Sequence, residues 1–146
     1  MTYFDTAYLA KCYLNELGSD AVRKLAAESE RVACCEFGRI ELAATIHRNL
    51  REGNITRAQH RLIQGQFDSD EANNVWTWLP VTPELIAAAT AKFRVMKGSI
   101  WLRAADALHL ACAVEHGFTE ICTNDRHLLA AAGAFKIRGR NVILSN

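Results

Sequence analysis

Residues 103–125 read RAADALHLACAVEHGFTEICTND and join a helix to the strand that follows it. Apolar residues fill most positions from 104 to 116, which predicts a buried helix, and Gly117 ends it. The short run TEICT, residues 119–123, predicts a buried strand, and Asp125 follows closely. This stretch therefore predicts the helix–strand alternation of an α/β fold.

The same alternation extends over the whole chain. Further strands are predicted at 2–4, 31–35, 75–81 and 141–144, and further helices at 6–16, 19–26, 37–51, 55–70, 83–97 and 125–132. Strands that alternate with helices form a mostly parallel sheet covered on both faces. No linker, repeat or low-complexity segment divides residues 1–146, so we expect a single domain.

Composition indicates a folded protein outside the membrane. The 146 residues are 50% hydrophobic and 23% charged, and no apolar run approaches the roughly 20 residues that span a bilayer. The start, MTYFDTAYLAK, lacks the basic segment of a signal peptide. The five cysteines include no CxxC pair and lie mostly in apolar runs, which favours buried thiols over disulfides. We therefore expect a cytoplasmic protein.

Four acidic residues occupy comparable places in this pattern. Asp5 and Asp125 follow predicted strands, while Glu41 and Asp106 lie in early turns of predicted helices. Ligands of parallel sheets bind beyond the carboxyl ends of the strands, so topology brings at least three of these side chains to one edge. Helix capping explains Asp5 and Asp125 about equally well. Glu41 and Asp106 have apolar neighbours, and a buried carboxylate usually needs a partner or a metal ion.

A carboxylate cluster suits a hard divalent cation such as Mg²⁺ or Mn²⁺. A water of lowered pKa at such a site can attack a phosphodiester. If the four acids share one pocket, the remaining chain carries 17 basic and 12 acidic residues, a surplus of five positive charges that modestly favours a polyanionic partner.

Four ordered motifs carry a resemblance to a known family. FDTAYLAKCYL, IELAATIHR, RAADALHLACA and CTNDRHLLAAA begin at residues 4, 40, 103 and 122. In this order they resemble the PIN-domain family, and more narrowly the VapC-type toxins, the ribonucleases of type II toxin–antitoxin pairs.

The resemblance implies a three-layer fold around about five strands and a Mg²⁺- or Mn²⁺-dependent endoribonuclease. It implies that Asp5, Glu41, Asp106 and Asp125 are the metal-site and catalytic residues. Thr6, Thr123, Asn124 and His109 are then candidates for supporting the site or contacting substrate. The resemblance further implies an RNA substrate, a homodimer, and a small antitoxin whose tail enters the active-site groove.

Several alternatives stay open at this stage. A PIN nuclease of RNA processing without a toxin role, or a catalytically silent binding module, would share the motifs. Glu36 departs from the family pattern and is a possible extra acid, while Asn124 could be a turn residue. Trp101 could stack a base or simply pack, and Arg103 and Arg126 could contact RNA phosphates.

Overall fold

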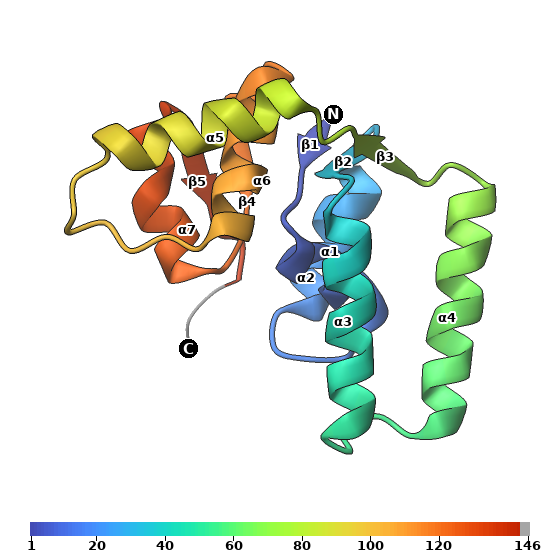
Figure 1. Cartoon of the computed structure of the whole chain (residues 1–146). Helices are drawn as coiled ribbons and strands as arrows, with labels where there is room; N and C mark the ends of the chain where they lie inside the picture. The colour runs from blue at the N-terminus through green and yellow to red at the C-terminus, as the bar shows by residue number, and fades with distance from the viewer. Residues whose placement is uncertain (144–146) are drawn as a thin grey trace.

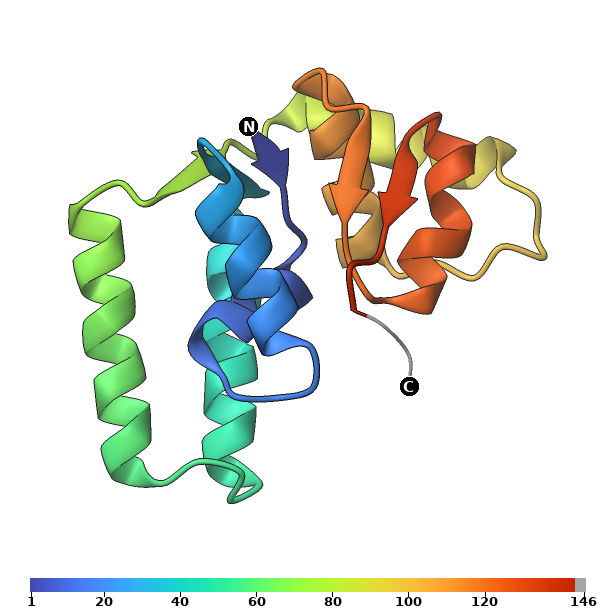
Figure 2. The same ribbon diagram turned by 180° about the vertical axis from the view of Figure 1, so that it is seen from behind.

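The computed structural model describes residues 1–143, whose strands and helices form an α/β fold (Figure 1 and Figure 2). The strands are β1 (Thr2–Tyr3), β2 (Val32–Cys35), β3 (Trp76–Leu79), β4 (Glu120–Cys122) and β5 (Arg138–Arg140). The helices are α1 (Thr6–Tyr13), α2 (Ser19–Glu28), α3 (Gly38–Arg51), α4 (Arg57–Ala72), α5 (Pro83–Val95), α6 (Ala104–Glu115) and α7 (Arg126–Ala131), with a 3-10 turn, η1, at Ala132–Phe135. The predicted fold class is confirmed.

All strand pairs are parallel. β2 pairs with β1 on one side and β3 on the other, while β4 pairs with β5. A single parallel bridge between Phe4 and Cys122 joins the two groups, and the backbone N–H of Asp5 donates to the carbonyl of Cys122 at 3.1 Å. The carboxyl ends of β1 and β4 therefore lie side by side, which brings the segments after them together.

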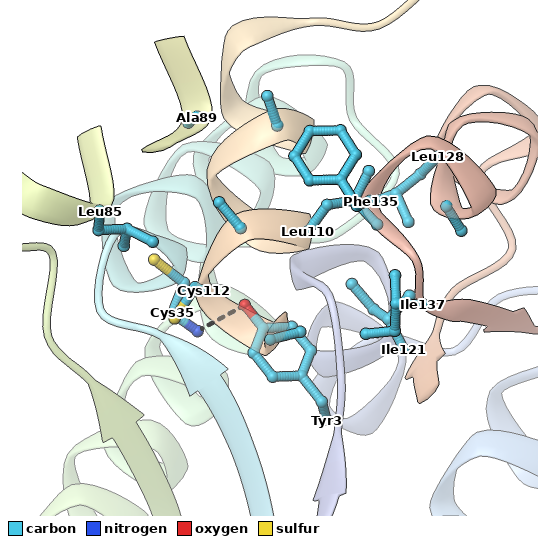
Figure 3. Packing of buried hydrophobic residues seen from close by; sticks show 14 of the residues in the cluster. Tyr3, Cys35, Leu85, Ala89, Leu110, Cys112, Ile121, Leu128, Phe135 and Ile137 are labelled. Carbon is cyan, nitrogen blue, oxygen red and sulfur yellow. Dashed lines mark hydrogen bonds between the residues drawn. The ribbon is translucent and has the colours of Figure 1, made fainter. Parts of the chain in front are cut away.

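Both faces of the sheet are buried. Along β2, Val32 and Cys34 face a core built with α1 and α2, whereas Ala33 and Cys35 face a core built with α5, α6 and α7 (Figure 3). Successive strand residues point to opposite faces, so an all-apolar strand must be covered twice. The result is the predicted three-layer arrangement.

Two long helices, α3 and α4, extend away from the sheet as a pair (Figure 1). Leu42 and Ile46 of α3 are buried with α1, and Ile63 and Phe67 of α4 pack against them. No residue of α4 is itself buried, in keeping with its polar sequence. Among the described residues, no helix has the length and apolar character needed to cross a membrane.

One predicted element lies elsewhere. The last strand was expected at 141–144, but β5 covers Arg138–Arg140; residue 144 itself lies outside the described residues. β5 forms through backbone pairing with β4, and its two arginines donate to the Glu120 carboxylate. Its side chains are polar, so apolar patterning could not locate it.

Candidate functional site

A pocket of about 410 Å³ contains all four acidic residues expected at the site. Asp5 caps α1 at the end of β1, and Asp125 caps α7 after β4. Glu41 lies in the first turn of α3, and Asp106 in the first turn of α6. The four side chains, which come from four different elements, therefore line one pocket.

Asp5 is buried and uses both carboxylate oxygens. Oδ1 accepts the backbone N–H of Tyr8 at 2.9 Å, and Oδ2 accepts the hydroxyl of Thr123. The Thr123 oxygen in turn accepts the backbone N–H of Asp125 at 2.9 Å. Burial raises the pKa of Asp5 to about 6 against these hydrogen bonds. Asp5 therefore caps helix α1, and burial also makes ionisation of its carboxyl unfavourable.

Arg103 holds two of the acids together. Its Nε donates to Asp106 Oδ2 at 2.9 Å, and its Nη2 donates to Asp125 Oδ2 at 2.7 Å. The hydrogen bond to Asp106 is the main reason that the pKa of Arg103 is raised. The guanidinium therefore contacts both carboxylates and offsets their negative charge.

Glu41 is held from two directions. Its Oε2 accepts the Thr6 hydroxyl at 2.7 Å and lies 2.7 Å from Nε2 of His109. Burial opposes ionisation, but the hydrogen bond and charge of His109 outweigh it and lower the pKa of Glu41. Because a carboxylate only accepts hydrogen bonds, Nε2 of His109 carries the proton.

His109 is buried and is fixed from its other side by Tyr3. The Tyr3 hydroxyl lies 3.0 Å from Nδ1 of His109 and accepts the backbone N–H of Cys35 at 3.2 Å (Figure 3). Burial disfavours the charged ring, but Cys34 and Glu41 together hold the pKa of His109 well above its usual value. The chain of contacts from Cys35 to Glu41 sets the orientation of the carboxylate.

We expect Tyr3→Phe to disturb this chain of contacts and to weaken binding of a divalent cation at the pocket. The change removes one hydroxyl, frees Nδ1 of His109 and leaves the Cys35 N–H without its partner. Loss of such a supporting contact typically lowers metal affinity or activity about 10- to 100-fold. The measurement is the apparent Mg²⁺ affinity, taken from the rise in unfolding temperature with Mg²⁺ concentration. Tyr13→Phe is the matched control, since the Tyr13 hydroxyl bonds Asp70 and Trp76, away from the pocket. Equal Mg²⁺ dependence in both variants would contradict the role.

The four acids have the oxygen chemistry that Mg²⁺ and Mn²⁺ prefer, so they are the residues that could hold such an ion. In the arrangement of residues 1–143, no three histidine, cysteine, aspartate or glutamate side chains come together as a ready metal site. Asp106 and Asp125 are instead paired with the Arg103 guanidinium.

The supporting residues predicted from the motifs divide into two groups. Thr6, Thr123 and His109 each bond one of the four acids. Asn124 and Glu36 are exposed and do not line the pocket, so the suggestion that Glu36 adds a ligand finds no support in this arrangement.

Sequence reasoning missed two contacts. Arg103 was noted as a phosphate-binding candidate, but its pairing with the acids was not; the three-residue spacing to Asp106 was an available signal. The contact of Tyr3 with His109 joins β1 to α6 across 106 positions. No local pattern announces such a contact.

The model of the PIN-domain family matches residues 2–134. The chain therefore belongs to the PIN-domain family.

Among solved structures, the chain is similar to FitAB bound to an IR36 DNA fragment, with 16% identity, a TM-score of 0.71, and coverage of 100% of this chain and 98% of that one. It is also similar to FitAcB from Neisseria gonorrhoeae, with 15% identity, a TM-score of 0.70, and coverage of 97% and 98%. These likenesses establish the fold. No curated protein matches the chain.

Proposed function

We propose that this chain is a Mg²⁺- or Mn²⁺-dependent endoribonuclease and the toxin of a VapC-type toxin–antitoxin pair. One observation carries the proposal: Asp5, Glu41, Asp106 and Asp125, each from a different motif, line the same pocket of a PIN fold. PIN domains are generally nucleases. The site residues and the metal requirement are part of this proposal.

The four carboxylates would hold the ion. For this, Asp106 and Asp125 would give up their ion pairs with Arg103. The bound cation would supply charge neutralisation and a water acidic enough to attack a phosphodiester. The chain's own residues do the positioning: Thr6 and His109 orient Glu41, and Thr123 orients Asp5.

Basic and polar groups that line the pocket suit a phosphodiester. Arg48 and Asn49 of α3 line the pocket together with Arg103. Once released from its carboxylates, Arg103 would add a second guanidinium. Arginine binds phosphate oxygens in a bidentate geometry, so these groups would hold the substrate backbone beside the acids.

The toxin role implies two protein partners. We propose a small antitoxin that covers the pocket and a homodimer of this chain. The resemblance of the four motifs supports both, and the similarity to FitAB, which is bound to DNA in its structure, is compatible with a DNA-binding antitoxin. Induced expression should arrest growth, and co-expression of a cognate antitoxin should relieve the arrest. Unaffected growth would count against the toxin role.

Metal removal tests the nuclease chemistry directly. Purified protein is expected to cut single-stranded RNA in Mg²⁺ or Mn²⁺, to lose all cutting in EDTA, and to regain it when Mg²⁺ is added in excess. The products are followed by gel electrophoresis of an end-labelled RNA. Equal cutting with and without EDTA would overturn the proposal.

A further inference from the structure

Trp101 is a large aromatic side chain exposed beside the pocket. It stands just before α6, and 55% of its surface is open to solvent. Its neighbours Ile100 and Leu102 pack against the core, whereas Trp101 does not. Because the two neighbours are anchored in the core, the residue between them points its indole outward. Core packing therefore does not explain the aromatic side chain at this position.

The indole lies one side chain away from the acidic residues. The Arg103 guanidinium carbon is 5.7 Å from the centre of the Trp101 ring, and the same guanidinium bonds Asp106 and Asp125. A group stacked on Trp101 would therefore lie next to whatever occupies the carboxylate pocket.

A second ring and a second arginine complete the cluster. The His127 ring packs 4.1 Å from the Trp101 ring, centre to centre, at an angle of 53°. Nε of Arg126 donates to Nε2 of His127 at 3.3 Å, so that nitrogen is an acceptor. His127 thus packs against the indole, Arg103 lies over the indole ring, and Arg126 bonds His127.

We propose that Trp101, supported by His127, is a stacking subsite for one unpaired nucleobase next to the scissile phosphate. This rests on the proposed nuclease function and adds to it a side chain that binds one base of the substrate. A base presents a flat apolar face to the indole, and its phosphates face the two arginines. In a duplex the bases are stacked on each other and cannot reach the ring, so the subsite selects single strands.

The experiment compares Trp101→Ala with Trp101→Phe. Binding of a fluorescent single-stranded RNA is measured by anisotropy in EDTA, and KM and kcat are measured in Mg²⁺. A stacking contact predicts that Trp101→Ala weakens binding about 5- to 150-fold and raises KM similarly, with kcat little changed. Trp101→Phe should restore most of the affinity. Phe93→Ala, another exposed aromatic but on α5, is the matched control.

A set of RNAs, each with one abasic nucleotide, then locates the base. Wild-type protein should lose affinity at one position, and Trp101→Ala should be insensitive to that same position. Binding by Trp101→Ala equal to wild type would overturn the subsite, as would an abasic scan without a sensitive position. If wild-type protein binds RNA but never cuts it in Mg²⁺, the nuclease proposal fails, while the binding data still decide the stacking contact.

Discussion

Asp106→Asn is expected to reduce metal-dependent RNA cleavage by about 100-fold or more, the usual effect of removing a group that stabilises charge in an active site. Asp106 is 7% exposed and stands in a helix whose remaining inward residues are mostly apolar. Its carboxylate would meet either Arg103 or the cation. Asparagine has the same shape but lacks the charge that holds a divalent ion, so the fold should survive while the site fails.

Two measurements separate a metal ligand from a structural acid. Mg²⁺ should raise the unfolding temperature of the wild-type protein, because it binds only the folded state, and should barely change that of Asp106→Asn. Asp20→Asn is the control, since the Asp20 side chain is fully exposed on α2. A folded Asp106→Asn protein that cuts RNA within about threefold of wild type would remove Asp106 from the site, given that losses of active-site charge are usually far larger.

The buried half of the fold could be predicted because its segments carry strong periodic signals. The apolar run that became α6, with Gly117 after it and β4 beyond, contains enough hydrophobic residues to define both elements. The start of α5 was equally clear, since Thr82 accepts from the Leu85 N–H and Pro83 opens the helix. β5 lacks such a signal, because backbone pairing with β4 and not side-chain burial forms it.

Part of the candidate site could also be predicted, because the order of strands and helices determines the topology of the sheet. Once strands alternate with helices in a parallel sheet, residues after β1 and β4 must share an edge, which is why Asp5 and Asp125 could be paired from sequence. The groups that support the acids come from distant segments. His109 reaches Glu41 across 68 positions, and Thr123 reaches Asp5 across 118. Only the packed structure defines these contacts.

Arg103 shows how far a sequence pattern can mislead about charge. Four acids in one place suggest strong mutual repulsion that only a metal ion can relieve. In this chain the Arg103 guanidinium bonds Asp106 and Asp125 and relieves part of the repulsion. Among the described residues, 1–143, no arginine or lysine bonds Asp5, and burial still raises the pKa of its carboxyl.

Asp5→Asn is therefore expected to abolish cleavage and yet stabilise the metal-free protein at neutral pH. Burial moves the pKa of Asp5 from 3.8 to about 6, so ionisation at pH 7.5 costs the fold about 3 kcal/mol. Asparagine is neutral and is as good a helix cap as aspartate. Its amide changes the hydrogen bond with Thr123, which removes about 1 kcal/mol of the gain. The net increase in unfolding free energy should be about 2 kcal/mol in EDTA.

The sign of the pH dependence follows from the raised pKa. Below about pH 4 the carboxyl is protonated in both the folded and the unfolded chain, so it costs nothing. Between about pH 4 and 6 the folded chain keeps the proton and the unfolded chain loses it, so stability falls as the pH rises. Above pH 6 the penalty is complete, and the advantage of Asp5→Asn over wild type is largest.

Denaturant unfolding of both proteins in EDTA at pH 4, 6 and 7.5 checks this expectation. Asp125→Asn is the matched control, because Asp125 caps a helix as Asp5 does but is paired with Arg103. Neutralising it removes an ion pair and should leave stability equal or lower. Mg²⁺ should reduce the difference in unfolding free energy between wild type and Asp5→Asn, since a bound cation offsets the buried charge. An Asp5→Asn protein less stable than wild type at pH 7.5 in EDTA would show that hydrogen bonding, and not the cost of a buried charge, governs this position.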